Sequence, residues 1–326
     1  MSQSAVSLVL NNPATTRVSA ARKERIISLL QQNSRLGPSG CRKSWNLGYV
    51  TDSCQDLSHP FYRHSLLGVE EGAGSNHYNL ILECFRGREL HLLRKGKVDG
   101  LVVRSGPALE YLQTVPEKIP LVLLNCATPV LDCDIVMPDN RGAIFQAVSY
   151  LAARGLQRIA FLGAAPDYSR YSCNYAERWQ TFPEACAYYG LDGQAELLPP
   201  AAASTAPAGA IASLVSVWLN SPRPPQAVIT VNYLYARLVQ AACPGLLTIA
   251  GDNNQDQDSA AENLLVLVQD VHFMGKLAVE LLLRRLSDRD RPFVRISSAV
   301  NLCQRGAKIS FPSSDSHRPE TVKEIQ

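Results

Sequence analysis

The sequence lacks the features of membrane-embedded and exported proteins. No apolar run approaches the ~20 residues that a membrane-spanning helix needs, although 46% of the 326 residues are hydrophobic. The first residues, MSQSAVSLVLNNP, contain neither a basic region followed by an apolar core nor a small-residue cleavage site. We therefore expect a cytoplasmic protein with no membrane partner.

Metal-site spacings are also missing. The nine cysteines form no C-x-x-C pair, and the six histidines show no ligand spacing with one another. Scattered single cysteines are usual in the cytosol, where thiols stay reduced. The sequence therefore predicts reduced, mostly buried cysteines and neither a metal nor a cofactor.

Four common enzyme signatures are absent. There is no G-x-G-x-x-G after a strand, no G-x-x-x-x-G-K-[ST], no G-x-S-x-G and no H-E-x-x-H. Their absence disfavours an enzyme. An enzyme on such a scaffold is kept as one alternative.

Charge is low and unevenly distributed. Charged residues make up 19% of the chain and the net charge is +3, but residues 1–46 hold seven Lys or Arg and one acidic residue. The remainder therefore carries −3. A basic amino-terminal arm on a slightly acidic body is typical of a phosphate-facing module beside a small-molecule domain, although a solvated basic tail gives the same count.

Short apolar runs alternate with segments of helical length from Leu47 onward. Runs of about five apolar residues without polar alternation are typical of strands covered on both faces, as in parallel sheets with helical crossovers. The sequence therefore predicts an α/β fold of doubly wound parallel sheets. The expected strands are 47–51, 78–84, 99–104, 120–124, 157–163, 226–231, 246–250 and 264–268. The expected helices are 61–73, 86–96, 140–154, 174–189, 208–219, 232–242 and 271–285.

The strand pattern restarts near residue 156, which predicts two similar lobes. Before the first lobe, Ser19 is placed to cap a helix AARKERIISLLQQ, and a Gly-Pro-Ser-Gly stretch breaks helical structure. The expected division is a helical segment 1–35, a linker 36–46, a first lobe of about 47–155 plus 269–288, a second lobe of about 156–268 plus 289–310, and a polar tail 311–326.

A series of motifs runs along nearly the whole chain, and their order and spacing together are informative. The motifs are SQSAVSLVLNN with TRVSAARKERI, then LGYVTD, HPFY, GVEEGA, VDGLVV, PLVLLN, PDNRGA with YLAARGLQRIAFLG, ER before YGL, and GDNN before VQD and MG. With these motifs in this order and spacing, the chain resembles the lactose-repressor/galactose-repressor family of bacterial transcription factors. The resemblance implies a partial all-α helix-turn-helix segment followed by a two-lobed, periplasmic-binding-protein-like (type I) effector domain.

The resemblance also assigns DNA contacts. In such headpieces the second helix enters the major groove, where its first side chains read base edges. The matching positions here are Gln3, Ser4, Ser7 and Leu8. Phosphate contacts would come from Arg17, Arg22 and Arg25, which position the protein without specifying sequence. Trp45 is placed either to wedge into the minor groove or to be buried in the first lobe.

The family's first headpiece helix has no counterpart here, because Met1 falls on the turn that follows it. Two short helices without a third are marginal in water. We therefore expect residues 1–35 to be poorly ordered and specific DNA affinity to be weak.

The resemblance further implies an effector pocket between the lobes. Its residues would be Phe61, Tyr62, Asp139, Arg178, Asn232, Asp252 and Gln269. Carboxylates accept hydroxyl groups, an arginine donates to oxygens, and an aromatic face covers the C–H side of a sugar ring. This set suits a monosaccharide or small glycoside, although Phe61 is equally suited to the core and Asp139 to a helix cap. Replacing Arg178 or Asp252 is expected to abolish the effector's stabilisation and to leave the unliganded fold intact.

The sequence thus predicts a non-enzymatic regulator that binds operator DNA as a homodimer and responds to a carbohydrate effector by lobe closure. The principal alternative is a sugar-binding protein of the same fold that does not bind DNA.

Overall fold

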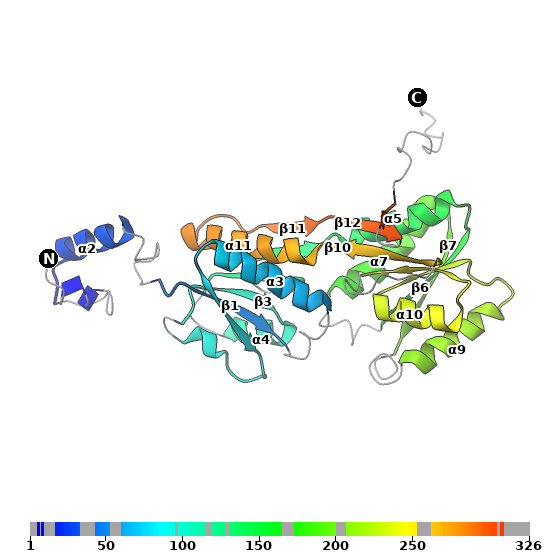
Figure 1. Ribbon diagram of the computed structural model, residues 1–326, viewed down its shortest axis with the longest axis horizontal. Coiled ribbons are helices and arrows are strands. Elements are labelled where there is room, and N and C mark those ends of the chain that lie inside the picture. Colours follow the sequence, from blue (N-terminus) through cyan, green and yellow to red (C-terminus); the bar gives the residue numbers. More distant parts are fainter. Residues whose placement is uncertain are drawn as a thin grey trace, which may run out of the picture.

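The computed structural model describes most of the chain apart from its two ends and several loops. The described residues are 5–6, 8–9, 17–32, 43–52, 60–94, 97–114, 119–127, 131–164, 173–199, 207–252, 262–304 and 307–309. From Asn46 onward they form two lobes, each built on its own sheet (Figure 1). No helix within these ranges is long and apolar enough to cross a membrane.

The first sheet is parallel throughout, in the order β11-β5-β4-β3-β1-β2. Its strands are β1 (Asn46–Thr51), β2 (Asn79–Cys84), β3 (Gly100–Arg104), β4 (Leu121–Leu124), β5 (Asp134–Pro138) and β11 (Arg295–Ser298). Its helices are α3 (Pro60–Ser75), α4 (Gly106–Thr114) and α11 (Val271–Ser287), with a 3-10 turn η2 (His91–Leu93). Leu47 and Tyr49 of β1 pack with α3 and α11, whereas Val50 packs with α4 on the opposite face.

The second sheet has the order β13-β12-β10-β9-β8-β6-β7. Its strands are β6 (Arg158–Ala164), β7 (Asp192–Leu198), β8 (Ala227–Thr230), β9 (Leu247–Ala250), β10 (Leu264–Gln269), β12 (Val300–Gln304) and β13 (Ala307–Lys308). Its helices are α5 (Asn140–Ala153), α7 (Cys173–Tyr189), α9 (Pro207–Leu219) and α10 (Tyr233–Ala242). The first five strands of each lobe share one order, β2-β1-β3-β4-β5 and β7-β6-β8-β9-β10. Both lobes are therefore doubly wound, as the sequence predicted.

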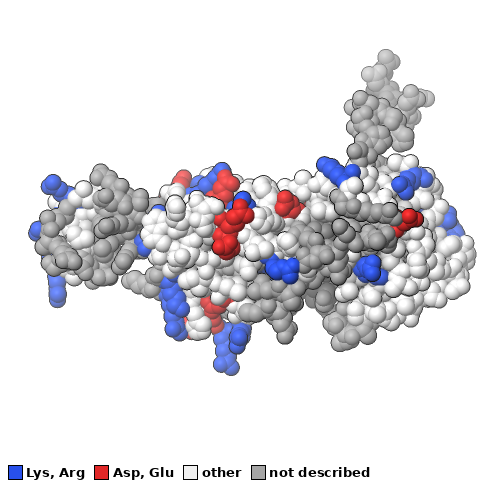
Figure 2. Space-filling model, viewed as in Figure 1, with Lys and Arg blue, Asp and Glu red and all other residues white. Residues whose placement is uncertain are grey.

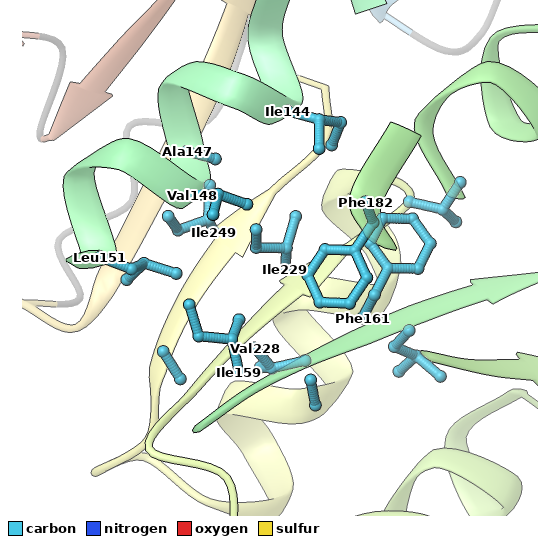
Figure 3. Packing of buried hydrophobic residues seen from close by; sticks show 14 of the residues in the cluster. Ile144, Ala147, Val148, Leu151, Ile159, Phe161, Phe182, Val228, Ile229 and Ile249 are labelled. Carbon is cyan, nitrogen blue, oxygen red and sulfur yellow. The ribbon is translucent and has the colours of Figure 1, made fainter. Parts of the chain in front are cut away.

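Helix α5 belongs to the core of the second lobe. Its buried residues Ile144, Val148 and Leu151 face the strands of the second sheet, near the rings of Phe161 and Phe182 (Figure 3), which are tilted 35° to each other. The two ring centroids lie 5.3 Å apart. The sequence had placed this helix in the first lobe, because strand spacing alone gave no sign that the chain crosses over before the helix.

Three segments connect the lobes. β5 leads into α5 at Asp139, β10 leads into α11 at Asp270, and β11 runs into β12 through Ala299. The backbone N–H of Asp139 donates to the carbonyl of Ser298 at 2.8 Å, so two of the crossovers are joined directly. The sequence placed all of 289–310 in the second lobe, whereas β11 pairs with β5 in the first sheet.

Glycine at position 68 lets α3 and α11 approach closely. A Cβ atom at Gly68 would lie 2.0 Å from the carbonyl oxygen of His272, and one at Gly275 would lie 2.4 Å from that of Ser65. The two helices therefore pack backbone to backbone, and together they cover one face of the first sheet (Figure 1).

All eight expected strands are confirmed, with small shifts at their ends, and six of the seven expected helices form. The expected helix 86–96 is wrong, because its described part holds only the turn η2. Strands β5 and β7 were missed for different reasons. β5 begins with the buried Asp134, which hides the apolar run, and β7 has five exposed residues in succession.

The cysteines require one correction. Among the residues that the structure describes, the free thiols are those of Cys126, Cys133, Cys173, Cys186, Cys243 and Cys303. Cys84 is disulfide-bonded, so the prediction that all the cysteines are reduced is wrong. Cys84 ends β2 beside Thr51 of β1, a neighbour 33 positions away in the sequence that spacing could not reveal.

The amino-terminal segment contains the expected helix α2 (Ala20–Gln32). Its Ile26 is buried with Val9 and Val18 in a small apolar cluster. Short helical pieces at 5–6 and 8–9 contribute to this cluster.

Candidate functional site

The second lobe brings three expected pocket residues together. Asn232 follows β8 and caps α10, Asp252 follows β9, and Arg178 projects from α7. The carboxyl ends of neighbouring parallel strands meet at one edge of a sheet, which is where ligands bind in open α/β folds. The edge of the second sheet formed by these carboxyl ends is therefore the candidate site.

Arg178 is the centre of this cluster and is only 2% exposed. Its Nη1 donates to the carbonyl of Val231 at 2.5 Å and lies 3.6 Å from Oδ2 of Asp252. Its Nε donates to Oδ1 of Asn140 at 2.9 Å. The guanidinium is thus held by α5, by the end of β8 and by Asp252 at once. It holds these three segments together around one positive charge.

Asp252 and Asn232 each use one oxygen for local structure. Oδ1 of Asp252 accepts the Tyr233 N–H at 2.8 Å, and Oδ1 of Asn232 accepts the Tyr235 N–H at 2.8 Å. The side chain of Asp252 is 20% exposed, so part of this carboxylate still faces solvent.

Tyr175 is a site residue that the sequence did not single out. Its hydroxyl accepts the Nδ2–H of Asn232 at 3.0 Å. Burial, followed by the nearby charge of Asp252, raises the pKa of Tyr175 well above its ordinary value. The phenol therefore stays neutral and keeps a proton to donate. Only the helical spacing of Tyr175 and Arg178 on α7 could have indicated it.

The first lobe contributes Tyr62 rather than Phe61. Phe61 is buried in the core beneath α3, where its ring meets that of Tyr62 edge-on at 5.3 Å. Tyr62 is half-buried, and the guanidinium of Arg104, at the end of β3, lies 3.8 Å from its ring centroid. This cation–π contact was not expected from the sequence.

Asp139 and Gln269 lie on the crossovers. Oδ1 of Asp139 accepts the Gly142 N–H at 2.8 Å, so this carboxylate caps α5, as the alternative interpretation of the sequence held. Gln269 is 1% exposed, and its Nε2 donates to the carbonyl of Gly251 at 3.4 Å. Asp139 therefore begins α5 after the first crossover, and Gln269 ties the end of β10 to the residue that follows β9.

A chain of asparagine amides links the lobes. Asn174 donates to Oδ1 of Asn125 in the first lobe at 2.8 Å, and Asn140 donates to Oδ1 of Asn174 at 2.8 Å. Asn140 also donates to Glu177 at 2.9 Å and accepts from Arg178. Asn125 has φ 57°, a left-handed conformation that asparagine tolerates better than most residues. Hydrogen bonds thus run unbroken from the first lobe to the Arg178 cluster.

Only some of the expected DNA-contacting residues are among those that the structure describes. Gln3, Ser4 and Ser7 lie outside the described residues. The expected phosphate contacts Arg17, Arg22 and Arg25 are all exposed. Figure 2 shows blue Lys and Arg side chains projecting from the amino-terminal segment. Leu8 is half-buried and packs on the small cluster of that segment.

Trp45 lies against the first lobe. Its ring centroid is 5.3 Å from that of Tyr78, and it packs on the cluster beneath α3 and α11. The sequence left two roles open for Trp45, a wedge in the minor groove or packing in the first lobe. In this structure the side chain packs on the first lobe.

The candidate site offers groups that can form hydrogen bonds with neutral polar ligands. Among the described residues it presents a carboxylate, a guanidinium, a neutral phenol and carboxamides, and no group of His, Cys, Asp or Glu able to hold a metal ion. Such a set donates to and accepts from hydroxyl groups.

The comparisons with known proteins agree with this fold. Residues 148–307 match the family model of the periplasmic binding protein-like domain. The chain is 27% identical over 269 residues to the HTH-type transcriptional regulator PtxS of Pseudomonas putida, covering 77% of this chain and 76% of that protein. It is 27% identical over 309 residues to the HTH-type transcriptional repressor CytR of Escherichia coli K12, covering 88% and 86%.

A solved structure has the same fold. The complex of the transcriptional regulator CelR with cellobiose superposes with a TM-score of 0.65 at 19% identity, over 91% of this chain and 93% of that one. The curated relatives combine a DNA-binding helix-turn-helix with regulation of transcription. The chain is therefore similar, over most of its length, to transcriptional regulators of the lactose-repressor/galactose-repressor type.

Proposed function

We propose that this chain is a transcriptional regulator whose effector is a sugar or small glycoside bound between the two lobes. The observation that carries the proposal is the Arg178–Asp252 pair beside the Tyr175–Asn232 hydrogen bond. A partly exposed carboxylate oxygen accepts hydroxyl groups, and the neutral phenol donates to them. Tyr62 provides a ring on the opposite lobe. The cellobiose bound by the structural relative CelR supports a carbohydrate ligand.

The proposed mechanism is a shift between two lobe arrangements. A ligand that contacts both lobes favours the closed arrangement, and moving the population from 1:99 to 99:1 requires about 5.5 kcal/mol of differential binding. The three crossovers and the asparagine chain are the described connections across which the lobes would move. No bond is made or broken, and we expect no turnover. As a cytoplasmic homodimer, the protein would read a near-palindromic operator.

The ligand is tested by thermal shift with sugars, sugar phosphates and purines. A ligand at ~100 times its Kd should add about 2.7 kcal/mol of stability. Asp252→Asn should remove this response. Asp192→Asn is the matched control, because Asp192 pairs with Arg223 at 3.1 Å on the exposed edge of the same lobe. A sugar response that survives Asp252→Asn would contradict the site, and a response to purines alone would contradict the ligand class.

DNA binding and assembly are tested without the ligand. Binding to DNA should weaken with salt, and Arg22→Gln and Arg25→Gln should each lower the slope of log K against log salt by about 1. Light scattering should show a dimer at micromolar concentration. Sugar binding with no retention on DNA at low salt would favour a stand-alone sugar-binding protein.

A further inference from the structure

The chain enters the first lobe through a bidentate contact with Asp99. Oδ1 of Asp99 accepts the Ser44 N–H at 2.8 Å, and Oδ2 accepts the Trp45 N–H at 3.0 Å. Both hydrogen bonds are partly buried and cross more than fifty residues of sequence. One carboxylate therefore fastens two successive backbone amides to the lobe, as a helix cap would, although no helix begins there.

Trp45 is held in a strained conformation by this contact. Its φ is 60°, in the left-handed region that a bulky side chain rarely adopts. Its ring lies against Tyr78, and Nζ of Lys43 lies 4.8 Å from the ring centroid. Burial and the neighbouring Asp99 raise the pKa of Tyr78 to about 12, as expected for a phenol enclosed beside a carboxylate. Strain of this kind persists only where the surroundings enforce it, and it gathers at switch regions.

The same contact ties the entering chain to two other strands. The Asn79 N–H, at the start of β2, donates to the carbonyl of Trp45 at 2.9 Å. The Asp99 N–H, just before β3, donates to the carbonyl of Asn46 at 2.9 Å. β1 then runs from Asn46 to Thr51, about 17 Å at ~3.3 Å per residue. The far ends of β1 and β3 carry Thr51 and Arg104, which are hydrogen-bonded to each other near Tyr62.

We propose that Asp99 is a positioning residue that docks residues 43–45 onto the first lobe, and that this latch has a docked and a released state. The docked state sets the direction in which the amino-terminal segment leaves the lobe. Strain at Trp45 favours release, and the two hydrogen bonds to Asp99 favour docking, so small movements of the strand ends bias the equilibrium. The coupling of the latch to an effector rests on the proposed function, whereas the latch itself does not.

The latch is tested by limited trypsin digestion of the full chain, following the Lys43–Ser44 bond by mass spectrometry. A protease needs an extended, undocked segment, so cleavage reports release. Asp99→Ala should speed this cleavage by about tenfold or more, as expected for losing hydrogen bonds to a charged acceptor. Asp99→Asn, which keeps one acceptor oxygen, should be intermediate, and Asp192→Ala is the control for a lost surface carboxylate. Circular dichroism verifies that each variant is folded.

An unchanged cleavage rate in folded Asp99→Ala and Asp99→Asn would overturn the latch. The coupling is tested separately with a sugar that raises the melting temperature of the wild type. That sugar should alter the Lys43–Ser44 cleavage rate in the wild type and leave the rate in Asp99→Ala unchanged. A merely stabilising role for Asp99 would not make cleavage at this bond respond to the sugar. If no sugar in the panel binds, the proposed function fails. The digestion of the unliganded variants still tests whether Asp99 docks residues 43–45.

Discussion

Replacing Arg178 with methionine should destabilise the unliganded protein as well as abolish its response to an effector. The substitution keeps the approximate volume and removes the charge. It leaves the Val231 carbonyl, Oδ1 of Asn140 and the Asp252 carboxylate without their buried donor. Breaking a buried ion pair by removing one partner costs about 3–5 kcal/mol. The lower end applies here, because the Asp252 side chain is 20% exposed and can recruit water.

A loss of ~3 kcal/mol corresponds to a fall in melting temperature of about 6–12 °C for a domain of this size. Calorimetry or thermal unfolding by circular dichroism measures it. Arg223→Met is the control, since Arg223 pairs with Asp192 while 74% exposed and such surface pairs contribute little. Adding Asp252→Asn to Arg178→Met should recover part of the loss. A melting temperature within ~2 °C of the wild type for Arg178→Met would refute the structural role of this guanidinium. From the sequence we expected that replacing either Arg178 or Asp252 would leave the unliganded fold intact. With this structure we keep that expectation for Asp252 and replace it for Arg178.

Three further predictions concern the first lobe. Arg285→Met should lower the free energy of unfolding in urea by about 3–5 kcal/mol, because the fully buried Asp134 loses the partner that donates to both of its oxygens; an unchanged midpoint would contradict this. Gly68→Ala should cost at least ~1–3 kcal/mol, since its Cβ would lie 2.0 Å from a backbone carbonyl oxygen of α11. Gly74→Ala, with open space around its Cβ, should be neutral or stabilising in the same assay. Because the pKa of Tyr78 is raised to about 12, its contribution to stability is complete below pH ~10 and lost as the pH rises through 12. A Tyr78→Phe variant should lack a phenolate transition near pH 12 in ultraviolet absorbance, and an unaltered titration would exclude this assignment.

Apolar runs predicted the strands because both faces of each sheet are covered. In β1, Leu47 and Val50 both needed to be apolar although they face opposite sides. Apolar runs did not predict β5, because this strand begins with a charged residue, Asp134. Asp134 is buried with Arg285, its ion-pair partner 151 residues later in the sequence. They did not predict β7 either, because that strand forms an exposed edge of its sheet.

The site residues that directly follow a buried strand could be predicted from the sequence. Asn232 and Asp252 come immediately after buried strands, and parallel strands bring such residues to one edge. Tyr175, Asn140 and Asn174 were missed because they lie on helices, and nothing local marks which helical side chains turn toward the cleft.

The sequence by itself determined the repeated α/β pattern, the two lobes and the family motifs, because these depend on hydrophobic periodicity and local turn chemistry. Tertiary structure alone decided which lobe holds α5 and β11, that Cys84 is disulfide-bonded, and that Trp45 docks on Asp99. Each of these depends on contacts between residues far apart in the chain. Such contacts are selected by packing and by the pairing of buried charges, which no local pattern records.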